Sequence, residues 1–108
     1  MKCLQKVKEA LLAVISEERL YHQEALKAGF PYCVWMEDGA GEQLNADNYM
    51  INQAIQGTID YYTQTEYDPV VDEIQAALNA ARISFYLNSV EYEDETKATH
   101  YEWVFEVS

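Results

Sequence analysis

The side chains that could perform chemistry in this chain are carboxylates, two histidines and two cysteines. Glu37 and Asp60 are of the type that forms a glycosidase-like acid and base pair. Fifteen carboxylates lie between Pro31 and Ser108, however, so pairs of this kind arise by chance. Acid and base catalysis also needs a pocket that perturbs both groups, which a sequence does not reveal. A solvated acidic face therefore explains these carboxylates better than catalysis.

The two histidines and two cysteines are the residue types that bind zinc. Cys3, Cys33, His22 and His100 supply four ligands in number, but they lack the close ligand spacing of a zinc site. Buried cysteines and half-exposed histidines are the ordinary interpretation. Cys33, in an apolar segment, is expected in the core and not as a reactive thiol.

An acidic, glycine-containing segment follows Met36. Asp38-Gly39-Ala40-Gly41-Glu42, with Asp47 beyond it, is acidic enough for a hard cation, but it lacks the alternating oxygen ligands of a calcium loop. It also lacks the Lys-Ser or Lys-Thr that ends a phosphate-binding loop. A plain exposed turn is the favoured interpretation. We therefore expect no metal, no cofactor and no enzymatic activity.

The aromatic residues are more informative than the titratable ones. Nine tyrosines and two tryptophans exceed what a core of this size needs, and aromatic side chains are favoured at the centres of protein interfaces. Core packing accounts for about half of them. Few Lys and Arg residues surround them, whereas base stacking normally needs a basic groove. The aromatics thus favour protein contact over nucleic-acid binding.

Two helices are predicted to position these side chains. Apolar residues recur at helical spacing from Leu4 to Ile15, which indicates an amphipathic helix of about three turns. Asp68-Pro69 supplies an N-cap and a first-position proline, and an apolar stripe from Val70 to Ala81 follows. Residues 17–30 fit both a short strand and a helical turn, and the sequence leaves them open.

Four strands complete the predicted fold. The strand-forming segments are Pro31 to Met36, Ile51 to Tyr62, Ile83 to Tyr92 with a change of phase at Asn88-Ser89, and Tyr101 to Val107. The loop Glu37 to Asn48 connects the first two, and Glu93 to Ala98 turns the last two into a hairpin. We expect one α+β domain over residues 1–108, with a mainly antiparallel four-stranded sheet flanked by two helices in the order α-β-β-α-β-β. An extra short strand or turn near 20–28 is compatible with this order.

The net charge of the chain disfavours some classes of binding partner. The net charge is −12, and residues 31–108 carry 15 acidic against two basic side chains. Such a chain repels phosphate and anionic lipid, so direct binding to nucleic acid is not expected. No segment reaches the roughly 20 apolar residues that span a bilayer. The two cysteines do not form a disulfide framework, and the sequence shows no signal-peptide pattern. Both features predict that the protein resides in the reducing cytoplasm.

Three blocks of the sequence together resemble a known family. They are Pro31-Tyr32-Cys33-Val34-Trp35 with Glu37-Asp38-Gly39, Asp47-Asn48 before Gln53-Ala54-Ile55-Gln56-Gly57-Thr58-Ile59-Asp60-Tyr61-Tyr62-Thr63, and Ser89-Val90-Glu91-Tyr92 with His100-Tyr101-Glu102-Trp103. Over nearly the whole chain, the pattern is similar to small prophage tail proteins of the tail-terminator, or tail-completion, family of long-tailed phages. The long segment Glu17 to Phe30 departs from that pattern.

This resemblance implies a structural role. Members of the family assemble as a ring, usually a hexamer, that ends the tail tube and meets the head-side connector. By analogy, we expect partners to be sister copies, the tube protein and the connector, in the virion and, during assembly, in the host cytoplasm. Within the loop, Glu37, Asp38, Glu42 and Asp47 are the expected contact residues.

Three alternatives remain open on the sequence alone. One is a head-tail connector component or another minor tail protein, which shares the small α+β design. Another is an acidic inhibitor that mimics DNA, motivated by the charge of −12. The third alternative, an enzyme, ranks last, because the sequence contains no nucleophile motif, no set of metal ligands at suitable spacing and no cofactor-binding loop.

Overall fold

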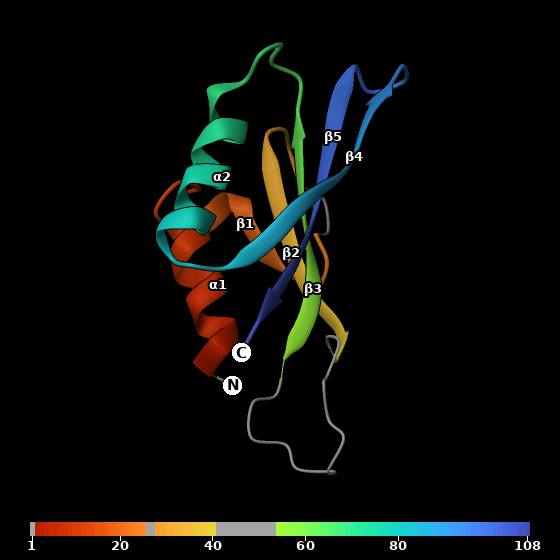
Figure 1. Cartoon of the computed structure of the whole chain (residues 1–108). Helices are drawn as coiled ribbons and strands as arrows, with labels where there is room; N and C mark the ends of the chain where they lie inside the picture. The colour runs from red at the N-terminus through yellow and green to blue at the C-terminus, as the bar shows by residue number, and fades with distance from the viewer. Residues whose placement is uncertain (1, 26–27, 41–53) are drawn as a thin grey trace.

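The computed structural model describes residues 2–25, 28–40 and 54–108, which form two α-helices, a short 3-10 helix and five strands (Figure 1). In chain order the elements are α1 (Lys2–Leu12), η1 (Glu17–Arg19), β1 (Leu20–His22), β2 (Tyr32–Ala40), β3 (Ile55–Thr63), α2 (Pro69–Ala80), β4 (Ser84–Glu93) and β5 (Ala98–Val107). Both helices lie on the same side of the sheet, as Figure 1 shows.

The strands form a mixed sheet in the order β1-β2-β3-β5-β4. The predicted α+β class and the order of the two helices and four main strands are confirmed. The extra short strand that the sequence allowed near 20–28 is present as β1, so the sheet has five strands and not four. β1 adds a fifth strand, and it pairs parallel to β2, with Leu20 opposite Cys33. The other three pairings are antiparallel. The edges of the described sheet are therefore the three-residue β1 and the ten-residue β4.

One arginine joins the two ends of the segment that the sequence left open, residues 17–30. Nη1 of Arg19 lies within 3.1–3.3 Å of the carbonyl oxygens of Gly29, Phe30 and Pro31, to which it donates. These contacts join the residues before β1 to those before β2. These hydrogen bonds satisfy the carbonyl groups of an irregular segment that does not pair as a strand. Such a segment needs no periodic pattern of residues, so the sequence does not reveal it.

Each helix begins and packs for reasons that the sequence contains. Oδ1 of Asp68 accepts a hydrogen bond from the backbone amide of Val70 at 2.9 Å, and Pro69 occupies the first turn of α2. Ile74 and Leu78 of α2 are fully buried. In α1 the buried side chains are Val7, Ala10 and Leu11, at the spacing of one helical face.

The core lies between the two helices and one face of the sheet. Its largest fully buried side chains are Trp103, Tyr61 and Phe105, which come from the two central strands β3 and β5. Nε1 of Trp103 donates to Oε1 of Gln75 in α2 at 3.0 Å, so the buried indole has its partner. We call this side of the sheet the helix-covered face.

The opposite side is called the open face. Since side chains alternate along a strand, residues paired with one another share a face. Tyr32 pairs with Tyr62, Tyr62 with His100, and Tyr86 with Val104. These residues alternate along their strands with the positions that face the core. No described helix packs on this face (Figure 1).

Candidate assembly surface

The four contact residues expected in the loop do not all lie in a loop. Glu37 and Asp38 belong to β2, which continues to Ala40, while Glu42 and Asp47 lie outside the described residues. The turn predicted to start at Glu37 is therefore wrong. The register shifts between Glu37 and Gly39, so Asp38 is the extra residue of a β-bulge and the strand resumes opposite Gln56.

Glu37 serves to join two strands. Its Oε1 lies 2.8 Å from Nε2 of His22 and accepts a hydrogen bond from Nε2 of Gln23 at 2.6 Å. The ring of His22 stacks on Trp35 with centroids 4.0 Å apart. Burial alone would raise the pKa of Glu37, but these hydrogen bonds and one from its own backbone outweigh burial and lower that pKa. Glu37 thus holds β1 against β2.

The acid and base pair considered from the sequence is not brought together. Glu37 pairs with Gly57, whereas Asp60, three residues further along β3, pairs with Val34. An odd separation places the two carboxylates on opposite faces of the sheet. Among the described residues, no group of three His, Cys, Asp or Glu side chains is arranged to hold a metal ion. Cys33 is fully buried, and burial raises the pKa of its thiol.

A row of stacked rings crosses the open face. The ring centroids of Tyr32 and Tyr62 are 4.6 Å apart, and those of Tyr62 and His100 are 4.2 Å apart. Nε2 of His100 lies 2.6 Å from Oδ1 of Asp60. That hydrogen bond raises the pKa of His100 against the effect of burial. Burial, then the charge of Asp60, raises the pKa of Tyr62 to about 12. The row is neutral or cationic, and it is flat, aromatic and partly exposed.

Strand β4 carries the most exposed apolar side chains of the sheet. Leu87, Val90 and Tyr92, which we call the β4 stripe, are 45%, 51% and 59% exposed. They pair with Trp103, Tyr101 and Thr99, so they point to the helix-covered side. In Figure 1 the outer half of the β4–β5 hairpin leans away from α2. The β4 stripe is therefore an apolar surface that no described element covers.

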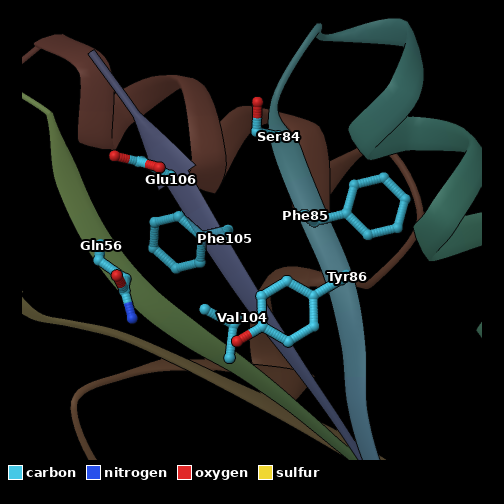
Figure 2. A pocket seen from close by; sticks show the side chains of 7 residues that line it. All are labelled: Gln56, Ser84, Phe85, Tyr86, Val104, Phe105 and Glu106. Atoms are coloured by element: carbon cyan, nitrogen blue, oxygen red, sulfur yellow. The ribbon is translucent and has the colours of Figure 1, made fainter. Parts of the chain in front are cut away.

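A small hollow lies at the other end of the same hairpin. It has a volume of about 180 Å³ and is lined by Gln56, Ser84, Phe85, Tyr86, Val104, Phe105 and Glu106 (Figure 2). Pockets for small-molecule ligands typically have volumes of about 300–1,000 Å³. In Figure 2 Tyr86 and Val104 lie side by side, with Gln56 and Glu106 toward one end. The size and the single carboxylate favour a dimple in a contact surface over a ligand site.

The sequence predicted the hairpin of β4 and β5 but did not identify the β4 stripe as a set. Among the tyrosines and tryptophans, Trp35, Tyr61 and Trp103 are buried, while Tyr86 and Tyr92 are exposed. The signal was available in Val90-Glu91-Tyr92, where apolar residues alternate with carboxylates.

Comparison with known proteins gives a likeness of fold. No family model matches the chain, and no curated protein matches it. The solved virion of a native gene transfer agent particle contains a chain that superimposes with a TM-score of 0.53 and 14% identity, covering 98% of this chain and 93% of that one. The two chains share a fold. No described helix of this protein is long and apolar enough to cross a membrane.

A second solved structure is less similar. It comes from work on the molecular mechanism of H-NOX activation, and it matches with a TM-score of 0.43 and 13% identity. The match covers 76% of this chain but only 37% of that one. This chain therefore spans little more than a third of that protein, and the likeness does not bear on function.

Proposed function

We propose that this chain is a structural protein of phage tail assembly, forming a ring at the end of the tail tube that terminates the tail and joins it to the head connector. The fold shared with a chain of a gene transfer agent virion, over nearly the full length of both, is the observation that carries the proposal. The sequence resemblance to tail-terminator proteins supports it independently. No catalytic step belongs to this function.

The exposed surfaces suit such a role. A protein that works by contact needs apolar and aromatic groups at its surface, and both the β4 stripe and the open face supply them. The charge of −12 suits a ring through which DNA passes, because an acidic channel does not retain the polymer. The partners in this proposal are sister copies, the tube protein and the connector.

Light scattering and electron microscopy test the proposal together. Purified protein should self-associate as its concentration rises, and rings should be seen on the ends of tail tubes assembled in its presence. The control is the same tube preparation without the protein. Only monomers up to millimolar concentration, together with uncapped tubes, would contradict the tail role.

Two rival functions have their own discriminating experiments. A connector or other minor tail protein would cross-link to the portal side in place of the tube protein. A DNA mimic is favoured by the carboxylates crowded at the hairpin turn, Glu91, Glu93, Asp94 and Glu95. It would capture a basic host protein from lysate at low salt and release it at high salt.

A further inference from the structure

Exposed apolar side chains concentrate on one strand. Among the described residues, six large hydrophobic side chains are exposed, and four of them belong to β4. Three form the β4 stripe, and the fourth, Tyr86, points to the open face. Scattered surface hydrophobics are normal, but a contiguous apolar run on a sheet edge marks a contact site.

The position of the helices explains why the β4 stripe is uncovered. Phe85, at the start of β4, packs against the core under the helices. Beyond it the register shifts between Leu87 and Ser89, and the strand continues with Val90 and Tyr92 on the same side. The stripe is backed by Tyr101, whose ring stacks on that of Trp103 with centroids 6.2 Å apart. It is therefore a firm surface and not a frayed end.

The β4–β5 hairpin that carries the β4 stripe is acidic. Between Ser84 and Val107 the chain carries six acidic residues and one lysine, a formal charge of −5. Four of the acids, Glu91, Glu93, Asp94 and Glu95, are exposed at the outer end of β4 and in the turn that follows. Glu91, Glu102 and Glu106 point to the open face, whereas Asp94 and Glu95 lie in the turn beyond Tyr92. A partner that brings apolar groups together with positive charge therefore complements the hairpin as a whole.

The exposed side of α1 has that chemistry. Lys2, Lys8, Glu9 and Leu12 are exposed, with Leu12 one helical turn after Lys8. The helix as a whole, with three lysines and one glutamate, carries a formal charge of +2. Its other side is occupied by Val7 and Leu11 in the core. In Figure 1, α1 lies toward the end of the molecule opposite the β4–β5 turn.

We propose that the β4 stripe of one copy docks on the exposed side of α1 of a second copy, through a head-to-tail contact. This inference rests on the proposed function and names the surfaces that join neighbouring subunits. Because the two surfaces differ and lie at opposite ends, every copy offers one of each. Contacts of this type build a closed ring or an open filament, depending on the rotation between neighbours.

Charge decides between this contact and the alternatives. A symmetric contact of two β4 stripes would bring together two hairpins with a formal charge of −5 each, whereas α1 brings a helix of +2 to a hairpin of −5. The other free edge, β1, is flanked by Glu17, Glu18 and Glu24, so it adds further negative charge. The exposed side of α1 is thus the best match among the described surfaces.

Two variants and their mixture test the head-to-tail contact. Val90→Asp disables the β4 stripe and Leu12→Asp disables α1, each at an exposed position. Measured by sedimentation velocity, each variant alone should associate at least about tenfold more weakly than the wild type. An equimolar mixture should form a one-to-one dimer that grows no further, because each variant retains one intact surface.

A symmetric contact gives a different pattern. If two β4 stripes met, Leu12→Asp would associate like the wild type and mixing would add nothing, which would overturn the proposal. Lys8→Glu provides a second test of α1 at an exposed position, with association again weakened. The matched control is Ala76→Asp, at an exposed position of α2 outside both surfaces, which should leave association unchanged. Circular dichroism establishes that each variant is folded.

The salt dependence of wild-type association provides a further test of the contact. Wild-type association should weaken as the salt concentration rises from about 0.05 to 0.5 M, because screening reduces the attraction between α1 and the acidic β4–β5 hairpin. If both variants associate like the wild type, the surfaces are wrong while the tail function stands. If the wild type is monomeric at every concentration, the contact is wrong, and the tube-capping experiment judges the function separately.

Discussion

The hydroxyl of Tyr61 in β3 donates a hydrogen bond to Oδ2 of Asp68, the N-cap of α2, at 2.7 Å. The same oxygen accepts from Oγ1 of Thr63 at 2.6 Å, and Oδ1 accepts from the amide of Val70. One buried carboxylate therefore caps the helix and fastens it to the central strand. Burial alone would raise the pKa of Asp68, but these hydrogen bonds outweigh it and lower that pKa.

Replacing Asp68 with alanine should destabilise the protein by about 2–4 kcal/mol, since it removes the helix cap and leaves the buried hydroxyls of Tyr61 and Thr63 without an acceptor. Urea unfolding measures the loss. The matched control is Asp72→Ala, an exposed carboxylate in the first turn of the same helix, which should change stability by about 0.5 kcal/mol or less. Equal losses would mean that the buried network contributes nothing beyond general helix electrostatics.

The acid dependence of stability follows from the same carboxylate. A carboxyl group whose folded pKa is lowered stabilises the protein above its unfolded pKa of about 3.9 and loses that contribution as pH falls through the folded value. The difference in unfolding free energy between the wild type and Asp68→Asn should therefore shrink below about pH 4. A difference that stays constant from neutral to strongly acidic pH would contradict the lowered pKa.

Gly57 is the position where the sheet leaves no room for a side chain. A Cβ there would meet the carbonyl oxygen of Met36 and approach the ring of Phe105 to 2.5 Å. Gly57→Ala should cost about 3 kcal/mol, measured by urea unfolding, because a backbone carbonyl cannot rotate away. Gly29→Ala is the control, since nothing lies within 4 Å of a Cβ added at that position.

A second variant separates the two obstacles at Gly57. Phe105→Leu shortens the ring but leaves the Met36 carbonyl in place. The double variant Gly57→Ala/Phe105→Leu should therefore recover none of the stability lost on adding the methyl group. Recovery to the level of Phe105→Leu alone would show that the ring was the whole obstacle.

The elements that sequence predicted well are those whose signals are local. The Asp68-Pro69 start of α2 and the change of phase at Asn88-Ser89 in β4 both occur as expected. β1 has three residues, too few for any periodicity, and its place depends on pairing with β2. Gly39 was taken for a turn signal, but the same residue type also serves at bulges, and only the partner strand distinguishes the two.

The candidate surface was less predictable for a related reason. Val90 and Tyr92 have the alternation of a strand with one buried face, and nothing local tells whether a helix reaches them. Their exposure depends on how the outer half of the hairpin leans away from α2, which only the tertiary structure shows. The buried position of Cys33, in contrast, followed from its apolar neighbours.

His100 should stabilise the fold in a pH-dependent way. Its pKa is raised above 6.5, first by the hydrogen bond with Asp60, so its contribution is full below about pH 6.5 and is lost as pH rises through the folded pKa. The difference in unfolding free energy between the wild type and His100→Gln should be larger at about pH 5.5 than at about pH 9. In an Asp60→Asn background this dependence should diminish, and an unchanged dependence would exclude Asp60 as the cause.

The two cysteines should differ sharply in reactivity, because only one is accessible. Cys33 is fully buried and burial raises its pKa, whereas Cys3 in α1 is partly exposed. Since the thiolate is the reactive form, an aromatic disulfide reagent should modify one thiol per folded chain and the second only after unfolding in urea. Cys3→Ser should abolish the fast reaction, while Cys33→Ser should retain it. Fast modification of the Cys3→Ser variant would mean that the sheet opens at β2, where the core and the stacked rings of the open face share a strand.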